Sequence, residues 1–460
     1  MKELILTSPL TLAFTISIGL IYFFVVFHYV GQDKKLATKL EFSLALLFVF
    51  ILSSGGISFP FDKLHFKVLG LLATTAPTIG GIIGIYTACI LLLSSRLRHT
   101  LKDFSYVLSV LINKDPSLCL IFLLVSFSVF WSETPIFTLR NSITYLLVSL
   151  FAIYIGKQYS WKDISLFLRW TTLCILLFSL KTPSDDGSGH WSGILGHKNP
   201  FSFFMAQTVI WWLLHAVYSP KHRGISIAIV LTALFGLQKG GSGAGKVIFI
   251  TLLCLWGYFG VLKKLPPRLA FLSVIIFMII GLCLTFWVTE NIKFIVVDTL
   301  NKDMTLTGRT DFWPQILAKI MHRPLLGYGV GGFWQPWRGS DNPAADIIVA
   351  KSLFRPQHSH NGFLELGVEL GFLGLLLFVI SLFSNIAKAI MHLSYTKQPE
   401  GGLPLLLLTY ALMTNLTETG LLGVTIVWFW YVVLTVRLSL DTTGSLFSNE
   451  INGGGSMKVD

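Results

Sequence analysis

The chain has 460 residues, of which 53% are hydrophobic and 13% are charged, and its mean hydropathy is +0.70. Soluble domains carry roughly 25% charged residues, so this composition excludes an ordinary soluble protein and indicates a multi-pass membrane protein. The formal net charge of +12 does not imply a nucleic-acid partner, because Lys and Arg lie in short loops between apolar runs, where the positive-inside rule requires them.

Apolar runs long enough to cross a hydrocarbon core of about 30 Å recur along the whole length. We therefore predict an all-α polytopic protein with about 12 to 14 transmembrane helices, and residues 66–76 as a candidate for a further short or re-entrant helix. The first run, from Pro9, is too long for a signal peptide and lacks its cleavage site, so it is predicted to be an uncleaved span. The predicted spans are 9–30, 41–53, 78–95, 117–131, 140–156, 164–180, 200–218, 224–238, 247–262, 268–288, 361–385, 403–417 and 419–437.

Clusters of Lys and Arg recur in alternate connections, which predicts that those connections lie in the cytoplasm. The clusters are Lys34, Lys35 and Lys39; Arg96, Arg98 and Lys102; Lys157 and Lys162; Lys221 and Arg223; Lys263, Lys264 and Arg268; and Lys388 and Lys397. Four unusual connections should then share the opposite, periplasmic face: 181–199, 239–246, 290–360 and the NLTETG turn at 415–420. The predicted organisation is N-terminal transmembrane helices over 1–289, a large periplasmic loop over 290–360, C-terminal transmembrane helices over 361–438 and a cytoplasmic tail over 439–460.

The 290–360 loop is the most informative segment, because a chain this apolar has few reasons to keep so polar a stretch between membrane spans unless it handles a polar substrate. It offers fixed cations and two imidazoles that titrate near neutral pH. These groups, with one carboxylate, are Arg309, Asp311, Arg323, Arg338, Arg355, His358 and His360.

Two short strings resemble nucleotide motifs but lack their context. Gly240 to Lys246 almost spells a P-loop, yet Val247 stands where Ser or Thr must hold Mg²⁺. The GxGxxG string that begins at Gly327 lacks the strand and the acidic residue of a dinucleotide site, so we predict a tight turn that packs Tyr328 and Phe333. The five cysteines lie in or beside apolar runs without metal-ligand spacing and are predicted to be small core residues.

Four strings, in this order, resemble the O-antigen ligase and polysaccharide polymerase superfamily of bacterial membrane proteins. The resemblance covers roughly the C-terminal three-fifths of the chain, and the combination is more specific than any one string. The strings are ILGHKNPFSFF at 194–204, GRTDFWPQIL at 308–317 continuing to RPLLGYGVGGF at 323–333, HSHNGFLELGVELGFLGL at 358–375, and NLTETGLL at 415–422.

This resemblance implies an all-helical, GT-C-like glycosyltransferase of the inner membrane, whose large periplasmic loop caps a cavity open to the periplasm. The implied donor is a glycan on undecaprenyl diphosphate, and the acceptor is a sugar hydroxyl of lipid A core or of a growing polysaccharide. No nucleotide, metal or other cofactor is implied. Membrane lipids and envelope polysaccharide assembly proteins are the remaining implied partners.

The resemblance also assigns two catalytic candidates. Arg309 matches the Arg of the family's GRxxxW pattern and is predicted to contact the diphosphate bidentately, the alternative being a pair with Asp311 or a helix cap. His360 matches the His of the family's HN motif and is predicted to accept the acceptor's proton. His358 is its competitor or an orienting group, and Asn361 completes the motif as a substrate-binding candidate.

Further substrate-binding candidates lie on the same face. His197, Lys198 and Asn199 precede Pro200, where a helix start would direct its positive end at the polar cavity, although Lys198 could instead snorkel. Glu418 could accept hydrogen bonds from sugar hydroxyls, hold an Arg side chain in place, or simply be solvated. The resemblance implies a second Arg near the KGGSGAGK string, but this chain offers only Lys239 or Lys246 there. A lysine ammonium is a point charge, whereas the arginine guanidinium can donate two parallel hydrogen bonds.

Three classes of function therefore remain. The first is a ligase or polymerase that uses a polyprenyl-linked glycan. The second is a lipid-glycan or solute transporter, which should place ionisable or broken-helix residues near the middle of the membrane. The third is a scaffold for envelope assembly, which would tolerate the loss of His360.

Overall fold

The computed structural model describes residues 25, 29, 33–54, 97–181, 189–300, 309–348 and 355–453, and the elements in these ranges are helices. The chain divides into two units, Met1–Tyr106 and Val107–Asp460, and the residues of the candidate site all belong to the second. The helices are α3 (Lys34–Ser53), α5 (Leu97–Lys114), α6 (Pro116–Phe127), α7 (Pro135–Gln158), α8 (Trp161–Lys181), α9 (Lys198–Tyr218), α10 (Arg223–Gly240), α11 (Gly243–Leu262), α12 (Pro267–Leu300), α13 (Arg309–His322), α14 (Gly362–Tyr395), α15 (Leu403–Thr414) and α16 (Ile426–Gly453). Short 3₁₀ helices are η3 (Ser128–Phe130), η4 (Gly193–Leu195), η5 (Pro220–His222), η6 (Pro336–Asp341) and η7 (Pro399–Gly402).

The protein is an all-α polytopic membrane protein. Within the described residues, seven helices are long and apolar enough to cross a membrane, or eight if the pair α5 and α6, bent by 108°, forms one broken span. The predicted spans at 224–238, 403–417 and 419–437 overlap α10, α15 and α16, which are not among these seven. The predicted spans at 9–30 and 78–95 and the candidate helix at 66–76 lie outside the described residues, apart from Val25 and Tyr29. The total of about 12 to 14 spans therefore stays a prediction.

Several predicted boundaries differ from the structure. Helix α12 continues to Leu300, past the predicted start of the loop at 290, and α16 continues to Gly453, past the predicted start of the tail at 439. Helix α16 begins at Ile426 rather than 419, because the Asn415 side chain donates to Ala411 O (2.7 Å) and accepts from Gly420 N (2.6 Å), which closes a turn there. The domain limits stay predictions.

One basic residue was assigned wrongly to a cytoplasmic loop. Lys388 lies inside α14, is 8% exposed, and its Nζ is 3.4 Å from Asp115 Oδ2. Asp115 sits at the bend between α5 and α6, where its side chain also caps α6. A buried lysine needs such a partner, so this residue reports on packing and not on membrane sidedness.

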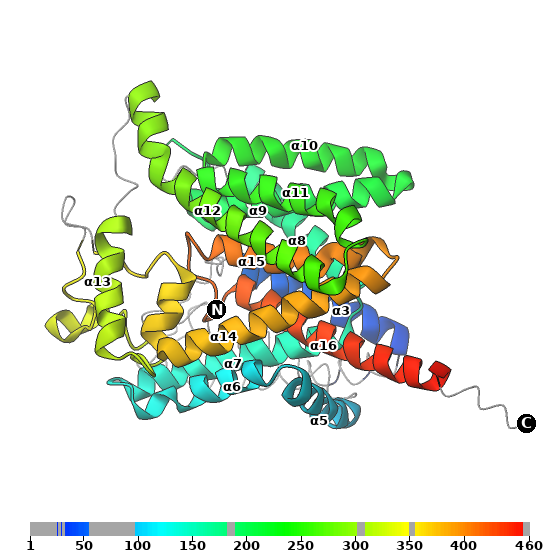
Figure 1. Ribbon diagram of the computed structural model, residues 1–460, viewed down its shortest axis with the longest axis horizontal. Coiled ribbons are helices and arrows are strands. Elements are labelled where there is room, and N and C mark those ends of the chain that lie inside the picture. Colours follow the sequence, from blue (N-terminus) through cyan, green and yellow to red (C-terminus); the bar gives the residue numbers. More distant parts are fainter. Residues whose placement is uncertain are drawn as a thin grey trace, which may run out of the picture. The chain divides into compact units, whose positions relative to one another are not determined.

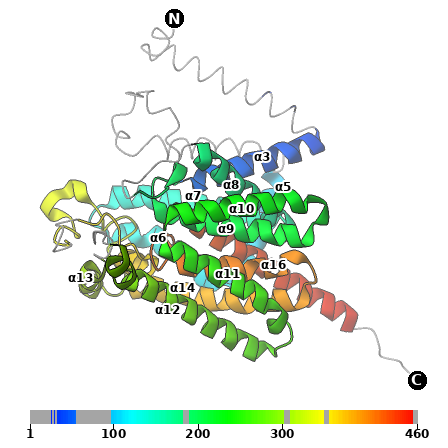
Figure 2. The ribbon, with the colours of Figure 1, turned by 90° about the horizontal axis from the view of Figure 1, so that it is seen from above.

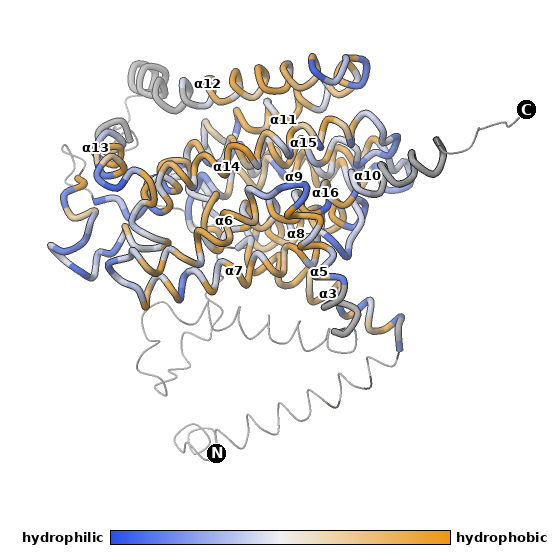
Figure 3. Tube along the Cα trace, turned by 60° about the horizontal axis from the view of Figure 1, so that its bottom comes forward, coloured by the Kyte–Doolittle hydropathy of each residue, from blue (hydrophilic) through white to orange (hydrophobic). Residues whose placement is uncertain are grey.

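The helices of the second unit pack in two groups (Figures 1 and 2). Helix α9 contacts α8, α10 and α11, and α12 lies on α11. The other group is formed by α6, α7, α14 and α16, and α15 touches members of both. Hydrophobic residues dominate these helices, whereas hydrophilic residues gather at their ends (Figure 3).

The KGGSGAGK string is the connection between α10 and α11. Gly241 ends α10 with φ 64°, a conformation that favours glycine, and Ser242 caps α11. A Cβ at Gly240 would lie 2.4 Å from Ser202 Oγ, and one at Gly245 would lie 2.6 Å from Ser202 Cβ. Small residues at these positions therefore let both helices approach α9, which explains the string without a phosphate.

Candidate active site at the meeting point of four connections

Helix α14 is broken, and the break holds the loop that precedes it. Gly371 has φ 66° and ψ −167°, so it interrupts the helix and frees carbonyls on its N-terminal side. Segment 323–333 donates backbone hydrogen bonds to Val368 O (2.8 Å) and Glu369 O (2.9 Å), and it accepts one from Phe372 N (2.7 Å). The short first part of α14 is thereby fixed beside the loop, with its N-terminus toward the candidate site.

The predicted tight turn at Gly327 is confirmed. Gly327, Gly329 and Gly331 all have positive φ, and the rings of Tyr328 and Phe333 pack with their centroids 5.0 Å apart. Both aromatic residues belong to a buried core beneath the loop that also contains Phe312, Ile316, Ile320, Ala344, Ile347 and Val368.

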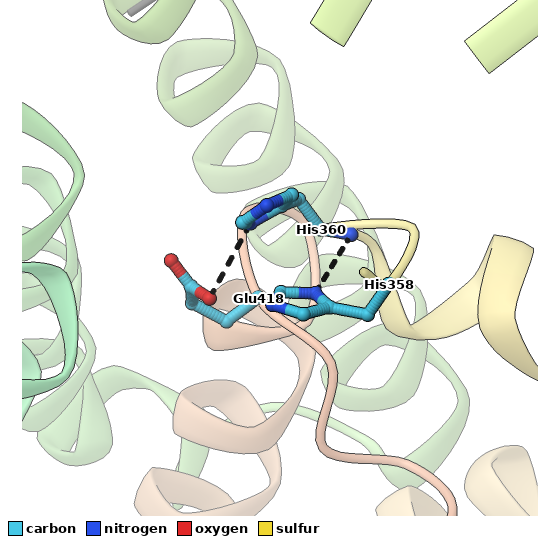
Figure 4. Close-up of side chains that lie close together, drawn as sticks. All are labelled: His358, His360 and Glu418. Atoms are coloured by element: carbon cyan, nitrogen blue, oxygen red, sulfur yellow. Dashed lines mark hydrogen bonds and ion pairs between the residues drawn. The ribbon is translucent and has the colours of Figure 1, made fainter. Parts of the chain in front are cut away.

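His358, His360 and Glu418 lie together, and we call them the histidine cluster (Figure 4). His360 N donates to His358 Nδ1 at 3.2 Å, and the centroids of the two rings are 3.9 Å apart. On the other side, His360 Nδ1 lies 3.7 Å from Glu418 Oε2. The cluster therefore joins the end of the 290–360 loop to the turn after α15.

His360 has an unusual backbone and an unusual ring environment. Its φ of 49° is the one positive φ of a non-glycine residue in the described part of the chain. Such a conformation costs about 1–3 kcal/mol and persists where the surroundings over-determine it, which occurs often at functional sites. Its Nδ1 is buried without a hydrogen-bond partner, because the Glu418 carboxylate is beyond hydrogen-bond distance.

Glu418 is itself held by two other connections. Asn199 Nδ2 donates to Glu418 Oε1 at 3.0 Å, and Ser242 Oγ donates to Asn199 Oδ1 at 2.9 Å. Each of the four connections predicted to share one face thus contributes a residue: Asn199, Ser242, His360 and Glu418. The contacts among them agree with a shared face, while the side of the membrane on which they lie stays a prediction.

The remaining predicted site residues occupy different places. Asn361 is 8% exposed and caps α14 by accepting from two backbone N–H groups at 2.9 and 3.2 Å. His197 caps α9 and is exposed, whereas Lys198 is buried. Lys239 is exposed, with its ammonium 5.5 Å from the centroid of the Phe235 ring.

Arg309 is the first residue of α13, but its side chain and that of Asp311 lie outside the described part of the structure. The predicted contact of Arg309 with a diphosphate therefore stays a prediction.

Sequence reasoning missed three residues that hold the cluster in place, namely Ser242, Trp313 and Glu365. Ser242 lies in the KGGSGAGK string, whose residues were considered as a P-loop and as the place of a second cation, but not for the Ser242 hydroxyl. Trp313 and Glu365 lay inside the GRTDFW and HSHNGFLE strings, and that position was the only signal that pointed to them.

The histidine cluster is also the group in the described residues whose donor atoms could share a metal ion. One donor atom from each of the three side chains lies within 4.8 Å of the others. Two imidazoles and one carboxylate are a ligand set that catalytic zinc sites use. Geometry alone thus permits either a proton-transfer site or a metal site.

A polar pocket of about 570 Å³ opens beside α13, lined by residues that include Glu133, Arg323, Tyr328 and Asp346. Glu133, in the turn before α7, forms ion pairs with Arg323 and with Arg338, the latter at 3.1 Å. Burial raises the pKa of the Tyr328 hydroxyl, against the opposing effect of Arg323. These contacts fasten the loop to the N-terminal end of α7.

The fold and the cluster define a multi-pass membrane protein with a polar site at the ends of its helices, and comparison with known proteins identifies its relatives. Residues 225–379 match the O-antigen ligase family, a range that includes Lys239, Arg309, His358 and His360 but not Asn199 or Glu418. This match covers about a third of the chain and supports a relation to the O-antigen ligase-like superfamily.

Two relatives support this placement. The chain is 24% identical over 288 residues to "Exopolysaccharide production protein ExoQ" of Rhizobium meliloti (strain 1021), an alignment that covers 59% of this chain and 65% of the relative. It is 25% identical over 250 residues to "Putative polysaccharide ligase RP358" of Rickettsia prowazekii (strain Madrid E), which covers 51% of this chain and 59% of the relative. The chain thus spans less than two thirds of the length of these relatives.

Proposed function

We propose that the protein is a glycosyltransferase of the ligase or polymerase kind that acts at the periplasmic face of the inner membrane. It transfers a glycan from undecaprenyl diphosphate to a sugar hydroxyl of lipid A core or of a growing polysaccharide. The observation that carries this proposal is His360, held in a strained backbone beside Glu418 where four connections meet, in a chain of this superfamily.

His360 acts as the general base. Its Nδ1 faces Glu418, so the tautomer with a proton on Nδ1 leaves Nε2 free to accept the proton of the acceptor hydroxyl. The acceptor oxygen bonds to the anomeric carbon as the bond from that carbon to the diphosphate oxygen breaks, and the diphosphate leaves with the electron pair. Glu418 stabilises the imidazolium that forms, and Asn199 and Ser242 hold the carboxylate in place.

The leaving diphosphate needs positive groups. Arg309 is the first residue of α13. A guanidinium can donate two parallel hydrogen bonds to a phosphate, and the N-terminus of a helix carries a partial positive charge that also favours one. The activated diphosphate ester contains the free energy for transfer, so neither ATP nor a metal ion is required.

Turnover by the purified, full-length protein in proteoliposomes tests this proposal. With a glycan on undecaprenyl diphosphate and a sugar acceptor, we expect glycan transfer and release of undecaprenyl diphosphate without nucleotide and in the presence of a chelator. Loss of turnover with chelator, restored by added metal, would assign the histidine cluster to a metal ion instead. A requirement for nucleotide would contradict the mechanism.

The type of acceptor can be read from the glycans of a deletion strain. Loss of long chains, with one repeat still attached to core, indicates a polymerase. Intact polymer stranded on the lipid carrier indicates a ligase.

Transport is the second candidate, and one observation favours it. Asp115 and Lys388 form a buried pair among the helices, where a transporter would keep ionisable groups. Flux of labelled lipid-linked donor across proteoliposomes without transfer to acceptor would support transport over glycosyl transfer. A scaffold would show neither activity.

A further inference from the structure

Ser359, between the two histidines, is held by side chains from two helices. It is 0% exposed, so its backbone groups cannot rely on water and must be paired inside the protein. Its N–H donates to Glu365 Oε2 at 2.9 Å, and its carbonyl accepts from Trp313 Nε1 at 3.0 Å. Both backbone polar groups of one residue are thus fixed by side chains, one from α14 and one from α13.

This arrangement acts directly on His360. The peptide that joins Ser359 to His360 carries the carbonyl that Trp313 binds, so its orientation is fixed. On the far side, Ser359 Oγ donates to Asn361 O at 2.6 Å, and Asn361 caps α14. His360 is therefore tied on both sides, which is the over-determination that a left-handed non-glycine residue needs.

Glu365 is oriented toward the backbone of Ser359 rather than toward a substrate. The oxygen that accepts from Ser359 N also accepts from Trp334 Nε1 at 3.0 Å. Trp313 likewise uses its one donor on the Ser359 carbonyl. Neither residue is therefore arranged to react, and both act through the backbone that carries His360.

We propose that Glu365 and Trp313 are positioning residues that clamp Ser359 and thereby hold the His360 imidazole in its reactive place. This proposal rests on the proposed function, in which His360 is the base. It also gives the GRTDFW and HSHNGFLE strings a physical role, because the Trp of the first string and the Glu of the second both hydrogen-bond to the backbone of Ser359.

The clamp is tested with purified full-length variants in the lipid-linked donor assay, with kcat, KM for the donor and thermal unfolding measured for each. Glu365→Ala and Trp313→Phe each remove one bond to Ser359, so we expect kcat to fall at least about tenfold while the donor KM changes less than about threefold. Glu365→Gln keeps an acceptor oxygen for Ser359 N and should recover kcat to within about threefold of the wild type.

Trp212→Phe is the matched control, because Trp212 Nε1 also donates to a backbone carbonyl, that of Arg169, at 3.3 Å. It removes the same kind of bond away from the cluster and should leave kcat unchanged. A kcat within about twofold of the wild type in Glu365→Ala or Trp313→Phe would overturn the clamp. If Glu365→Ala does not yield folded protein, Trp313→Phe decides in the same way.

Wild type and His360→Ala are assayed alongside to separate the two proposals. An inactive wild type, or an active His360→Ala, contradicts the proposed function. An active wild type and an inactive His360→Ala, together with fully active clamp variants, contradict the clamp alone. Equal losses in kcat and in thermal stability for Trp313→Phe and Trp212→Phe would show a general role of buried indoles and would also overturn the clamp.

Discussion

His360 and His358 are neighbours in space with different surroundings. The His360 ring has a carboxylate 3.7 Å from Nδ1 and packs edge-on against Phe312, with ring centroids 6.4 Å apart. His358 Nδ1 instead accepts from the backbone N–H of His360. His360 thus lies beside a carboxylate that can stabilise its protonated form, whereas His358 supports the backbone next to it.

This difference predicts unequal effects of removing each imidazole. His360→Ala removes the proton acceptor and should lower turnover on the order of 10²-fold or more, with donor binding largely retained. His358→Ala removes one acceptor of a backbone hydrogen bond and should cost less than about tenfold. Turnover of the purified variants with a lipid-linked donor measures both. Near-normal turnover in His360→Ala together with loss of turnover in His358→Ala would show that His358 is the base. Near-normal turnover in both variants would contradict a histidine base.

Helix α14 performs two tasks because it is broken. Its first part, up to Leu370, carries the cap Asn361 and the clamp residue Glu365, while the part after Gly371 forms the long apolar span. The φ and ψ of Gly371 lie in a region that is essentially restricted to glycine. A Cβ there would lie 2.4 Å from the backbone of Leu325.

Gly371→Ala should therefore destabilise the protein by at least about 2 kcal/mol and impair transfer, since strain and a backbone clash act together. Gly257→Ala in α11 is the matched control, because a Cβ at Gly257 meets nothing within 4 Å. Its thermal midpoint should be unchanged or slightly higher. Thermal unfolding of both variants in the same detergent makes the comparison, and equal midpoints would show that the break at Gly371 is not required.

Across the whole molecule, the site is built from connections that are distant in the sequence. Asn199 and Glu418 lie 219 positions apart, yet their side chains share a hydrogen bond. The 290–360 loop, predicted as one polar segment, contains the end of α12, all of α13 and η6, and contacts the turn before α7 through Glu133. The charge pattern predicts that this end of the bundle faces the periplasm.

Cysteine labelling tests that orientation. In a background without the five native cysteines, Ser340→Cys in η6 should react with a membrane-impermeant maleimide in intact spheroplasts. Lys264→Cys, in the exposed connection between α11 and α12, is the control and should react only after lysis. The reverse pattern would invert the topology and remove the periplasmic site.

The sequence by itself determined the class of protein, and its apolar runs located most of the long apolar helices in the described residues, although not the more polar α5 and α13. Its motifs resemble those of O-antigen ligases, which the family match over residues 225–379 supports. Apolar run length and charge are local properties that a membrane enforces on each segment separately, so they can be read without knowing how the helices pack. The strings that carry the resemblance likewise identified His360, Glu418 and Asn199 as candidates. The sequence did not tell which candidates meet, because that depends on contacts between segments that no local pattern encodes.

Only the tertiary structure decided those contacts. It joined Ser242, Asn199, Glu418 and His360 in one chain of contacts, and it placed Lys239 against Phe235 instead. It also showed Lys388 buried beside Asp115, where charge counting had predicted a cytoplasmic loop. The physical reason is the same in each case: a buried polar group takes its partner from whichever helix lies beside it, and the fold of the whole chain decides which helix that is.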